Sequence, residues 1–443
     1  MRYEKYKQTG TKWITSIPVS WDMQKIGALF VQRKEKVSDK DFAPISVTKN
    51  GILPQLATAA KTDDGDNRKK VCVGDFVINS RSDRKGSCGV SDLEGSVSLI
   101  NIVLQPREQL SGKYAHYLLR NHLFSEEYYR NGRGIVADLW TTRYSEMKTI
   151  LLPVPPREEQ EQIVRYLDWQ VSKINRLIAA KRKRIELVKE HFSVRIANIV
   201  CNGLKPNIPM RETGIDYIGA IPSHWTVLQN KRLFKSMNRT FQGIPTVLSL
   251  SQKDGLIPYS EMTERSLHTS SYENWQLVCP NDLVLNRFKA HLGVFFASKY
   301  TGIVTFHYGV YEAKMPLVAK YYEVLYHTPE YCRIYAGQSR GMTVGLQNLS
   351  DTNFYSTYTV YPPNEEQREI VTEIEQIEKQ QSSIIAGVNR QIEKLQEFRT
   401  RLISDVVTGQ IDVRGIKVPD DEYINNEITE EEFEEESENN EEE

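Results

Sequence analysis

The chain has 443 residues, of which 40% are hydrophobic and 26% are charged, as in an ordinary globular protein. This length exceeds what one hydrophobic core usually organises, so we expect at least two domains. No apolar run is long enough to span a membrane, and the first residues lack the apolar core of a secretory signal. These features argue against a membrane protein and favour a cytoplasmic one.

The net charge of -1 conceals an uneven distribution of charge along the chain. Residues 420–443 hold 14 acidic residues and no lysine or arginine, which leaves 57 basic against 44 acidic residues in the remainder. A basic body suits a polyanionic partner, although a plain solvated surface would have the same composition. The acidic segment has almost nothing apolar to bury, so we expect it to be disordered.

The five cysteines form no Cys-x-x-Cys pair and have no histidine at ligand spacing, so neither a zinc site nor a disulfide is expected. Two of them, Cys72 and Cys279, precede apolar runs at equivalent places in the chain. We interpret these two as small core residues. The sequence predicts no metal site.

The first predicted domain, residues 1–155, opens with a motif that returns later in the chain. Short β-branched and aromatic runs follow it, separated by turn signals, and predict strands, with a helix at 113–129. We expect a compact α/β domain with a twisted mixed sheet. The opening motif comprises Lys7-Gln8-Thr9-Gly10, Trp13-Ile14 and Ile17-Pro18-x-x-Trp21.

Two loops of the first domain carry side chains that suit DNA binding. Arginine and lysine can pair with guanine or hold phosphates, and asparagine can pair with adenine. The glycines beside Arg133 would let the backbone approach a phosphate closely. Exposed polar loops without this role would look similar. The candidate DNA-binding residues are Asn79, Arg81, Ser82, Arg84 and Lys85 in one loop and Arg133, Thr141 and Arg143 in the other.

A long helix is predicted over residues 156–203, after the pair Pro155-Pro156. Apolar residues recur there at alternating spacings of three and four, a heptad pattern sustained over about forty residues. Glu158-Glu159 suits the first turn, where the helix dipole favours acidic residues, and Gly203 suits the end. An ordinary buried helix is the alternative, but the length favours a coiled coil.

The second predicted domain, residues 204–361, repeats the first at an offset of about 204 residues. Its frame is similar, with a helix predicted at 319–337, but its polar loops differ in sequence, which suggests two targets read by one geometry. The copied motif reads Arg211-Glu212-Thr213-Gly214, Tyr217-Ile218 and Ile221-Pro222-x-x-Trp225. The candidate DNA-binding residues are Asn286, Arg287, Lys289 and His291 in one loop and Arg340 and Asn348 in the other.

A second long helix is predicted over residues 362–412, again after a Pro-Pro pair, with Gly409 near its end. Gly387 falls where the first helix has Ala180, so we expect a bend or a weak point there. Because the two helices have equivalent apolar stripes, we expect them to form an antiparallel coiled coil with one domain at each end. The helices would then set the distance between the domains. Residues 413–443 form the acidic tail.

Catalytic motifs are missing from the sequence. There is no Gly-x-x-x-x-Gly-Lys-[Ser/Thr] loop for ATP, and neither Pro-Pro pair has the flanking residues of an adenine methyltransferase. There is also no glycine-rich turn between strand and helix for a methyl donor. We therefore predict a binding protein with no catalytic residues.

The ordered set of doubled motifs resembles the specificity subunit of type I restriction-modification enzymes. The resemblance extends from about Lys7 to Val413 and is specific because every motif is present twice in the same order. It rests on the two Ile-Pro-x-x-Trp motifs, the two strands that follow Gly74-Asp75 and Asn281-Asp282, and the two Pro-Pro-x-x-Glu-Gln openings of the long helices.

The resemblance implies two pseudo-symmetric α/β target-recognition domains, each reading one half of a bipartite asymmetric double-stranded DNA sequence. The paired helices would act as a ruler and would dock two modification subunits, which methylate adenine with S-adenosylmethionine. Restriction subunits that translocate DNA with ATP and cleave it with magnesium would complete the complex. This chain itself would hold no cofactor.

Two other functions remain open at this stage. The chain could be a scaffold that holds partner proteins without reading DNA. It could also be a self-sufficient nuclease that uses Glu146-Met147-Lys148, although such a short motif is common by chance. Arginine, lysine and asparagine at matching loop positions of both domains favour DNA reading over the scaffold.

Overall fold

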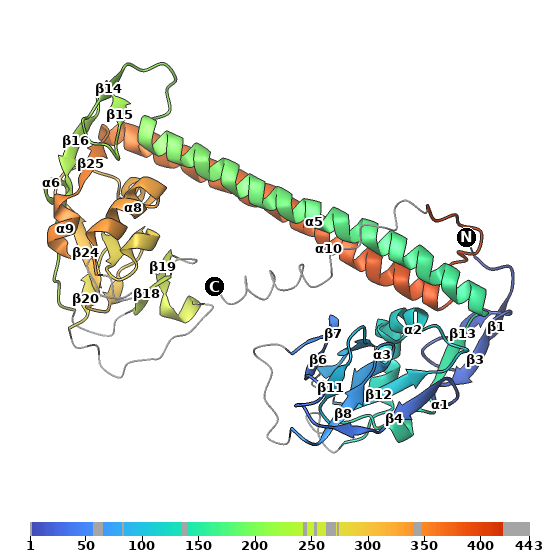
Figure 1. The fold of residues 1–443 in the computed structure, drawn as a ribbon. Coiled ribbons are helices and arrows are strands. Elements are labelled where there is room, and N and C mark those ends of the chain that lie inside the picture. Colours follow the sequence, from blue (N-terminus) through green and yellow to red (C-terminus); the bar gives the residue numbers. More distant parts are fainter. Residues whose placement is uncertain are drawn as a thin grey trace. The chain divides into compact units, whose positions relative to one another are not determined.

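The computed structural model describes residues 2–55, 65–81, 84–134, 140–241, 246–251, 255–262, 272, 274–339 and 348–419. It divides into two compact units, one made of Met1–Lys183 with Val388–Glu443 and the other of Arg184–Gly387. Each unit contains one β-rich domain and part of both long helices (Figure 1). The predicted tail beyond residue 419 lies outside the described residues.

The domain of the first unit is built on a four-stranded antiparallel sheet in the order β10-β9-β12-β4. Smaller antiparallel sheets surround it. Its strands are β1 (Tyr6–Gln8), β2 (Ser16–Pro18), β3 (Asp22–Lys25), β4 (Phe30–Arg33), β5 (Lys36–Val37), β6 (Ile45–Thr48), β7 (Gly51–Pro54), β8 (Arg68–Val71), β9 (Phe76–Asn79), β10 (Cys88–Val90), β11 (Gly95–Val97), β12 (Asn101–Pro106) and β13 (Leu151–Val154). Its helices are α1 (Ile26–Leu29), α2 (Gly112–Leu119), α3 (His122–Arg130) and α4 (Tyr144–Met147).

The domain of the second unit repeats this arrangement, with a four-stranded antiparallel sheet in the order β17-β24-β21-β22. Its strands are β14 (Met210–Glu212), β15 (Ala220–Pro222), β16 (Thr226–Gln229), β17 (Phe234–Ser236), β18 (Leu248–Ser251), β19 (Gly255–Pro258), β20 (Gln276–Val278), β21 (Leu283–Asn286), β22 (Phe295–Ala297), β23 (Gly302–Val304), β24 (Tyr308–Ala313) and β25 (Tyr358–Tyr361). Its helices are α6 (Asn230–Leu233), η3 (Tyr259–Glu261), η4 (Ala290–Leu292), α7 (Ala319–Tyr326), α8 (Pro329–Gln338) and α9 (Asp351–Ser356).

The expectation of one mixed sheet in each domain was wrong. All pairs of described strands are antiparallel, and parallel pairing occurs only in the isolated bridges Pro44–Ser96 and Val247–Ile303. Strands of two to six residues with frequent turns favour hairpins over the long crossovers that parallel strands require. The mixed α/β class itself is correct.

The two predicted short helices are each divided in two. In the first domain the break falls at Asn121, whose side chain accepts a hydrogen bond from Leu123 N and thereby begins α3. In the second domain Thr328 precedes Pro329 at the first position of α8, where proline is tolerated. Each break lets a second helix pack at a new angle, which the apolar pattern alone did not reveal.

The long helices are α5 (Arg157–Asn202) and α10 (Asn364–Val407), and they lie side by side (Figure 1). In the first unit Arg399 donates to Asn175 Oδ1 at 2.7 Å and Lys181 donates to Gln391 Oε1 at 2.6 Å. In the second unit Arg195 pairs with Glu373 at 2.8 Å. In the first unit, contact positions rise along α5 as they fall along α10, so the pairing is antiparallel, as predicted. In the second unit Gly203 lies against Glu366, which together with the pair of Arg195 and Glu373 gives the same direction.

Glycines end both long helices. Gly203 and Gly409 follow α5 and α10 with φ of 81° and 73°, the left-handed conformation that terminates helices. The predicted weak point at Gly387 is not a break, because α10 continues through it. One glycine costs a helix only about 1 kcal/mol, which the apolar stripe on either side offsets.

In each unit the Ile-Pro-x-x-Trp motif is hydrogen-bonded to the glutamate-rich opening of a long helix. The indole of Trp21 donates to Glu159 at 2.9 Å, and the indole of Trp225 donates to Glu366 at 3.0 Å. The two tryptophans are 0% and 1% exposed. The Ile-Pro-x-x-Trp motif therefore fixes the start of the long helix that follows its own domain.

The end of the other long helix lies against the same tryptophan. A Cβ on Gly409 would lie 3.1 Å from the Trp21 ring and 2.4 Å from Pro18, and a Cβ on Gly203 would lie 3.3 Å from the Trp225 ring. Each tryptophan thus meets the first turn of one long helix and the last turn of the other. Both glycines are required by close packing as well as by conformation.

The repeated aspartates support the turns that lead into β9 and β21. Asp75 pairs with Arg33 at 2.7 Å, and Asp282 pairs with Arg239 at 2.5 Å. Each carboxylate also accepts from a backbone N–H, that of Cys72 or of Cys279. Both cysteines are half-buried, so the prediction of core residues was wrong for them; they serve the turn through their backbone.

Candidate DNA interface

The two predicted loops of the first domain are joined in the structure. Ser80, directly after β9, accepts a hydrogen bond from Thr142 N at 3.0 Å. Arg81 and Arg133 each form a β-bridge with Thr141. Segments that are sixty residues apart in sequence therefore form one surface, at the end of the central strand β9.

Arginines dominate the exposed part of this surface. The side chains of Arg81, Arg84, Arg133 and Arg143 are exposed. The Arg133 side chain is 84% exposed, and its Nε lies 3.9 Å from the carboxylate of Glu146. A hydrogen bond from Ser145 and the nearby arginines hold the pKa of Glu146 below its usual range, so this carboxylate stays ionised. Its single negative charge offsets one of the four arginine charges. The surface as a whole can attract an anion.

Two of the predicted residues are already engaged, and a third lies outside the described residues. Lys85 pairs with Glu126 at 2.5 Å and lies 4.9 Å from the centre of the Tyr129 ring. Asn79 is 9% exposed, and its Oδ1 accepts from Arg81 N at 3.0 Å. Ser82 lies outside the described residues.

Asn286 makes the same turn in the second domain, where its Oδ1 accepts from Phe288 N at 3.1 Å. Such a bond between an asparagine side chain and the backbone two residues on shapes a turn. Both asparagines therefore hold their loops in position, a role that the sequence analysis did not assign to them.

Gly132, one of the two glycines beside Arg133, is also required by packing. A Cβ on Gly132 would lie 2.3 Å from the Trp140 Nε1 atom, so the space above the glycine is occupied by the indole. Trp140 stacks on Tyr129 at 5.8 Å between ring centres and donates to the Tyr129 carbonyl at 2.8 Å. The aromatic pair packs against the loop that carries Arg133. The sequence analysis did not predict this packing.

The second domain joins its loops in the same way. Leu349 N donates to the Arg287 carbonyl at 3.0 Å, which repeats the bond between Thr142 and Ser80. The Arg287 guanidinium pairs with Asp351 at 2.7 Å and is half-buried. The hydroxyl of Tyr311 donates to the same carboxylate at 2.8 Å. Arg287 is thus fixed in direction and partly neutralised.

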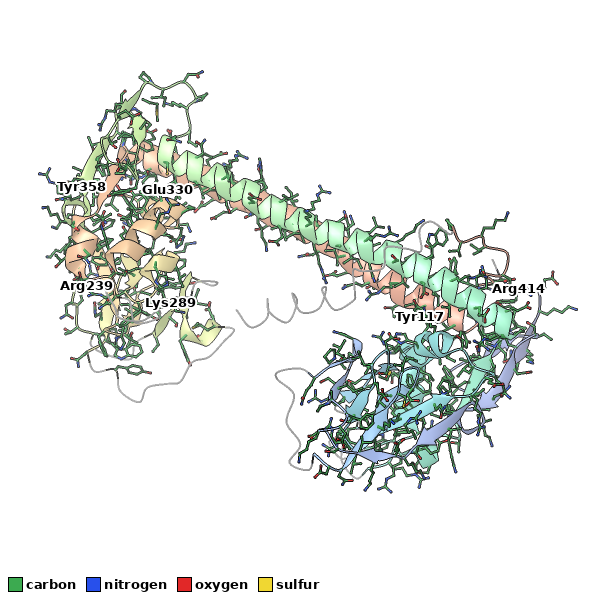
Figure 2. All side chains as sticks on the ribbon, in the orientation of Figure 1. Tyr117, Arg239, Lys289, Glu330, Tyr358 and Arg414 are labelled. Atoms are coloured by element: carbon green, nitrogen blue, oxygen red, sulfur yellow. The ribbon has the colours of Figure 1, made fainter. Side chains whose placement is uncertain are left out.

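The remaining predicted residues of the second domain are distributed around this junction. Lys289 is exposed and follows β21 (Figure 2), and Asn348 is exposed beside Leu349. His291 is half-buried in η4. Arg340 lies outside the described residues. The second surface therefore has fewer exposed cations than the first within the part that the structure describes.

Among the described residues no three histidine, cysteine, aspartate or glutamate side chains gather as a metal ion would require. None of the described helices is long and apolar enough to cross a bilayer.

The chain is similar to a protein of Methanocaldococcus jannaschii named "Putative type I restriction enzyme MjaX specificity subunit", with 22% identity over 246 residues. The match covers 52% of this chain and 54% of the relative, so the chain spans about half the length of that curated relative. No family model matches the chain.

Solved structures give a fuller match. A chain from a study of complex assembly and conformational transition of the type I R-M system superposes with a TM-score of 0.62 and 13% identity, over 89% of this chain and 99% of that one. The HsdS subunit from Thermoanaerobacter tengcongensis has a TM-score of 0.49 and 16% identity, over 91% and 100%. The chain therefore has the fold of a chain from a type I R-M system. The resemblance predicted from its doubled motifs agrees with the similarity to the specificity subunit of Methanocaldococcus jannaschii.

Proposed function

We propose that this chain is the specificity subunit of a type I restriction-modification system, and that it directs adenine methylation and ATP-dependent cleavage by partner subunits without catalysing either. Each domain reads one half of a bipartite asymmetric DNA target. The observation that carries the proposal is the pair of joined loops at the end of the central strand, built alike in both domains and rich in exposed arginine in the first.

Charge and geometry support DNA as the ligand. Exposed guanidinium groups such as those of Arg81 and Arg133 can hold phosphates or pair with guanine in the major groove. Their loops rest on a rigid sheet through backbone hydrogen bonds, which limits the entropy lost on binding. The loops differ between the domains while the frame repeats, so two different half-sequences are expected.

The long helices support the ruler and the partner docking that the resemblance implies. The antiparallel contacts within each unit make the pair a stiff element. Large apolar side chains lie exposed along it and suit a protein partner. They are Leu177, Leu187, Val194 and Phe398, exposed by 53%, 55%, 65% and 53%. The docked partners are two modification subunits that hold S-adenosylmethionine, and restriction subunits that hold ATP and magnesium join them in the cytoplasm.

The experiment compares Arg133→Ala with Arg107→Ala in the complex with the modification subunits. Arg107 is also exposed, but it follows the opposite end of β12 from the candidate surface. We expect Arg133→Ala to weaken binding of the target duplex about tenfold and to reduce its salt dependence, because one phosphate or base contact is lost. Arg107→Ala should bind normally. If the intact complex shows no preference for any DNA sequence, the scaffold function replaces this one.

A matched change in both helices tests the ruler. Four residues inserted into α5 and into the facing part of α10 lengthen the pair by about 6 Å, close to two base pairs of DNA. We expect the gap between the half-sites to grow while both half-sequences stay the same. An unchanged gap would show that the helices do not set the spacing.

A further inference from the structure

The second domain contains a pocket with aromatic walls. Phe241, Tyr272, Trp275 and Phe306 line it, together with the buried side chain of Ile303. The Tyr272 and Trp275 rings meet edge to face at 5.2 Å between centres. Tyr272 is 43% exposed and Phe306 is 56% exposed, so the pocket presents ring faces that nothing in the described structure covers.

The polar groups of the pocket are uncharged. Asn238, Thr240, Asn274 and Gln276 complete its lining, and none of the described lining residues carries a charge. The Gln276 amide donates to the Tyr308 carbonyl at 3.3 Å, which leaves its oxygen as an acceptor. Aromatic faces together with amide donors and acceptors suit a flat, neutral ring that has hydrogen-bonding groups along its edge.

The pocket is continuous with the candidate DNA interface of this domain. The ring of Phe306 lies 3.9 Å from that of His307, and His307 lies 5.7 Å from Phe288. Phe288 directly precedes Lys289 in the candidate loop. Asn286 and Tyr308 are partners in the register of β21 and β24, so the loop and the pocket rim are adjacent.

At the aligned positions that the structure describes, the first domain has Arg68 and Leu99 in place of two of the aromatic walls. Ile303 pairs with Leu277 in the second domain as Ser96 pairs with Lys70 in the first, which aligns Trp275 with Arg68. Arg68 is buried, and its Nε donates to Ser96 Oγ at 2.8 Å.

Leu99 aligns with Phe306, and its carbonyl accepts from Lys69 Nζ at 2.8 Å. The strands that both domains share are thus stable with Arg68 and Lys69 in the first domain, where the second domain has Trp275 and Gln276. The aromatic pocket is therefore a special feature of the second domain that folding does not demand.

We infer that the pocket binds one nucleobase, displaced from the double helix within the half-site that the second domain reads. This inference rests on the proposed function. Bases stack on aromatic side chains when they are unpaired, and amide groups can hydrogen-bond their exposed edges. The charged loop beside the pocket holds the backbone of the same strand.

The test uses the full complex and its own target duplex, with a mismatch placed at each base pair in turn by changing one strand only. Unpairing costs less for a mismatched base. A change of the base opposite the one that enters the pocket should therefore tighten binding roughly tenfold. Mismatches elsewhere should weaken binding or leave it unchanged, except at the adenines that the modification subunits methylate, which must also leave the helix. Phe306→Ala should abolish the gain, and Leu99→Ala, the matched control in the first domain, should retain it.

The outcomes separate this inference from the proposed function. If the complex binds its target specifically but no mismatch tightens binding, the inference fails and the proposed function stands. A gain away from the methylated adenines that survives in Phe306→Ala and in Trp275→Leu would also overturn it. If Phe306→Ala weakens assembly with the modification subunits and leaves the mismatch scan unchanged, the pocket binds protein and the inference is wrong. Absence of any specific binding would contradict the proposed function itself.

Discussion

Removing the carboxylate of Glu159 should loosen the junction between the first domain and α5. Glu159 is 7% exposed and accepts hydrogen bonds from the Trp21 indole at 2.9 Å and from the Tyr3 hydroxyl at 2.5 Å. Burial and this carboxylate raise the pKa of Tyr3 far above its usual value, so the phenol stays a donor at any ordinary pH. Glu159→Ala leaves two buried donors without an acceptor.

Each unsatisfied buried donor costs about 1–3 kcal/mol, but the substitution also removes a carboxylate whose own burial is unfavourable. We therefore expect a loss of about 2–4 kcal/mol in the free energy of local opening. Glu158→Ala is the matched control, because Glu158 is the exposed neighbour in the same motif and should cost less than about 0.5 kcal/mol.

Hydrogen exchange followed by mass spectrometry measures the local opening of residues 3–25 and of the first turns of α5. The expected loss corresponds to exchange that is faster by about thirtyfold to several hundredfold in Glu159→Ala, and by about twofold or less in Glu158→Ala. Equal exchange in the two variants would refute the assignment of Glu159 as the group that fixes the helix to the domain.

Three further results are expected. Gly409→Ala should destabilise the first unit by about 1–3 kcal/mol in thermal unfolding, because its φ is 73° and a Cβ would strike Pro18, whereas Gly415→Ala, with nothing within 4 Å, should be neutral. Burial raises the pKa of Cys88 to about 12, so iodoacetamide at pH 8 should spare this thiol in the folded protein; labelling as fast as that of the half-buried cysteines would contradict its burial. Arg81→Ala should weaken specific DNA binding about tenfold in a fluorescence titration while the complex still assembles, and normal binding would remove this loop from the interface.

The sequence predicted the duplication, the two long helices and their antiparallel pairing because each left a pattern that is periodic or repeated. The heptad stripes determine which helix faces meet, and Gly203 and Gly409 mark the ends. It did not predict the sheet topology, since strands of a few residues have no pattern that distinguishes parallel from antiparallel neighbours.

The sequence predicted which loops form the candidate site. It predicted less well which of their side chains remain available to a ligand. Pairing across the fold decides which cations remain available, and Lys85 with Glu126 and Arg287 with Asp351 lie far apart in sequence. The structural use of Asn79 also depends on a turn that only the backbone conformation reveals. An alignment of the two halves could have shown that Arg68 lies at the position of Trp275 and Leu99 at that of Phe306.

Methylation mapping tests the central claim most directly. The chain is co-expressed with its modification subunits, and methylated adenines are located across the genome of the host. The account predicts one asymmetric motif in two parts with a fixed gap, and loss of one part alone when the loops of one domain are replaced. A stable complex that methylates no defined motif, or a motif without a gap, would contradict the reading of DNA by two domains.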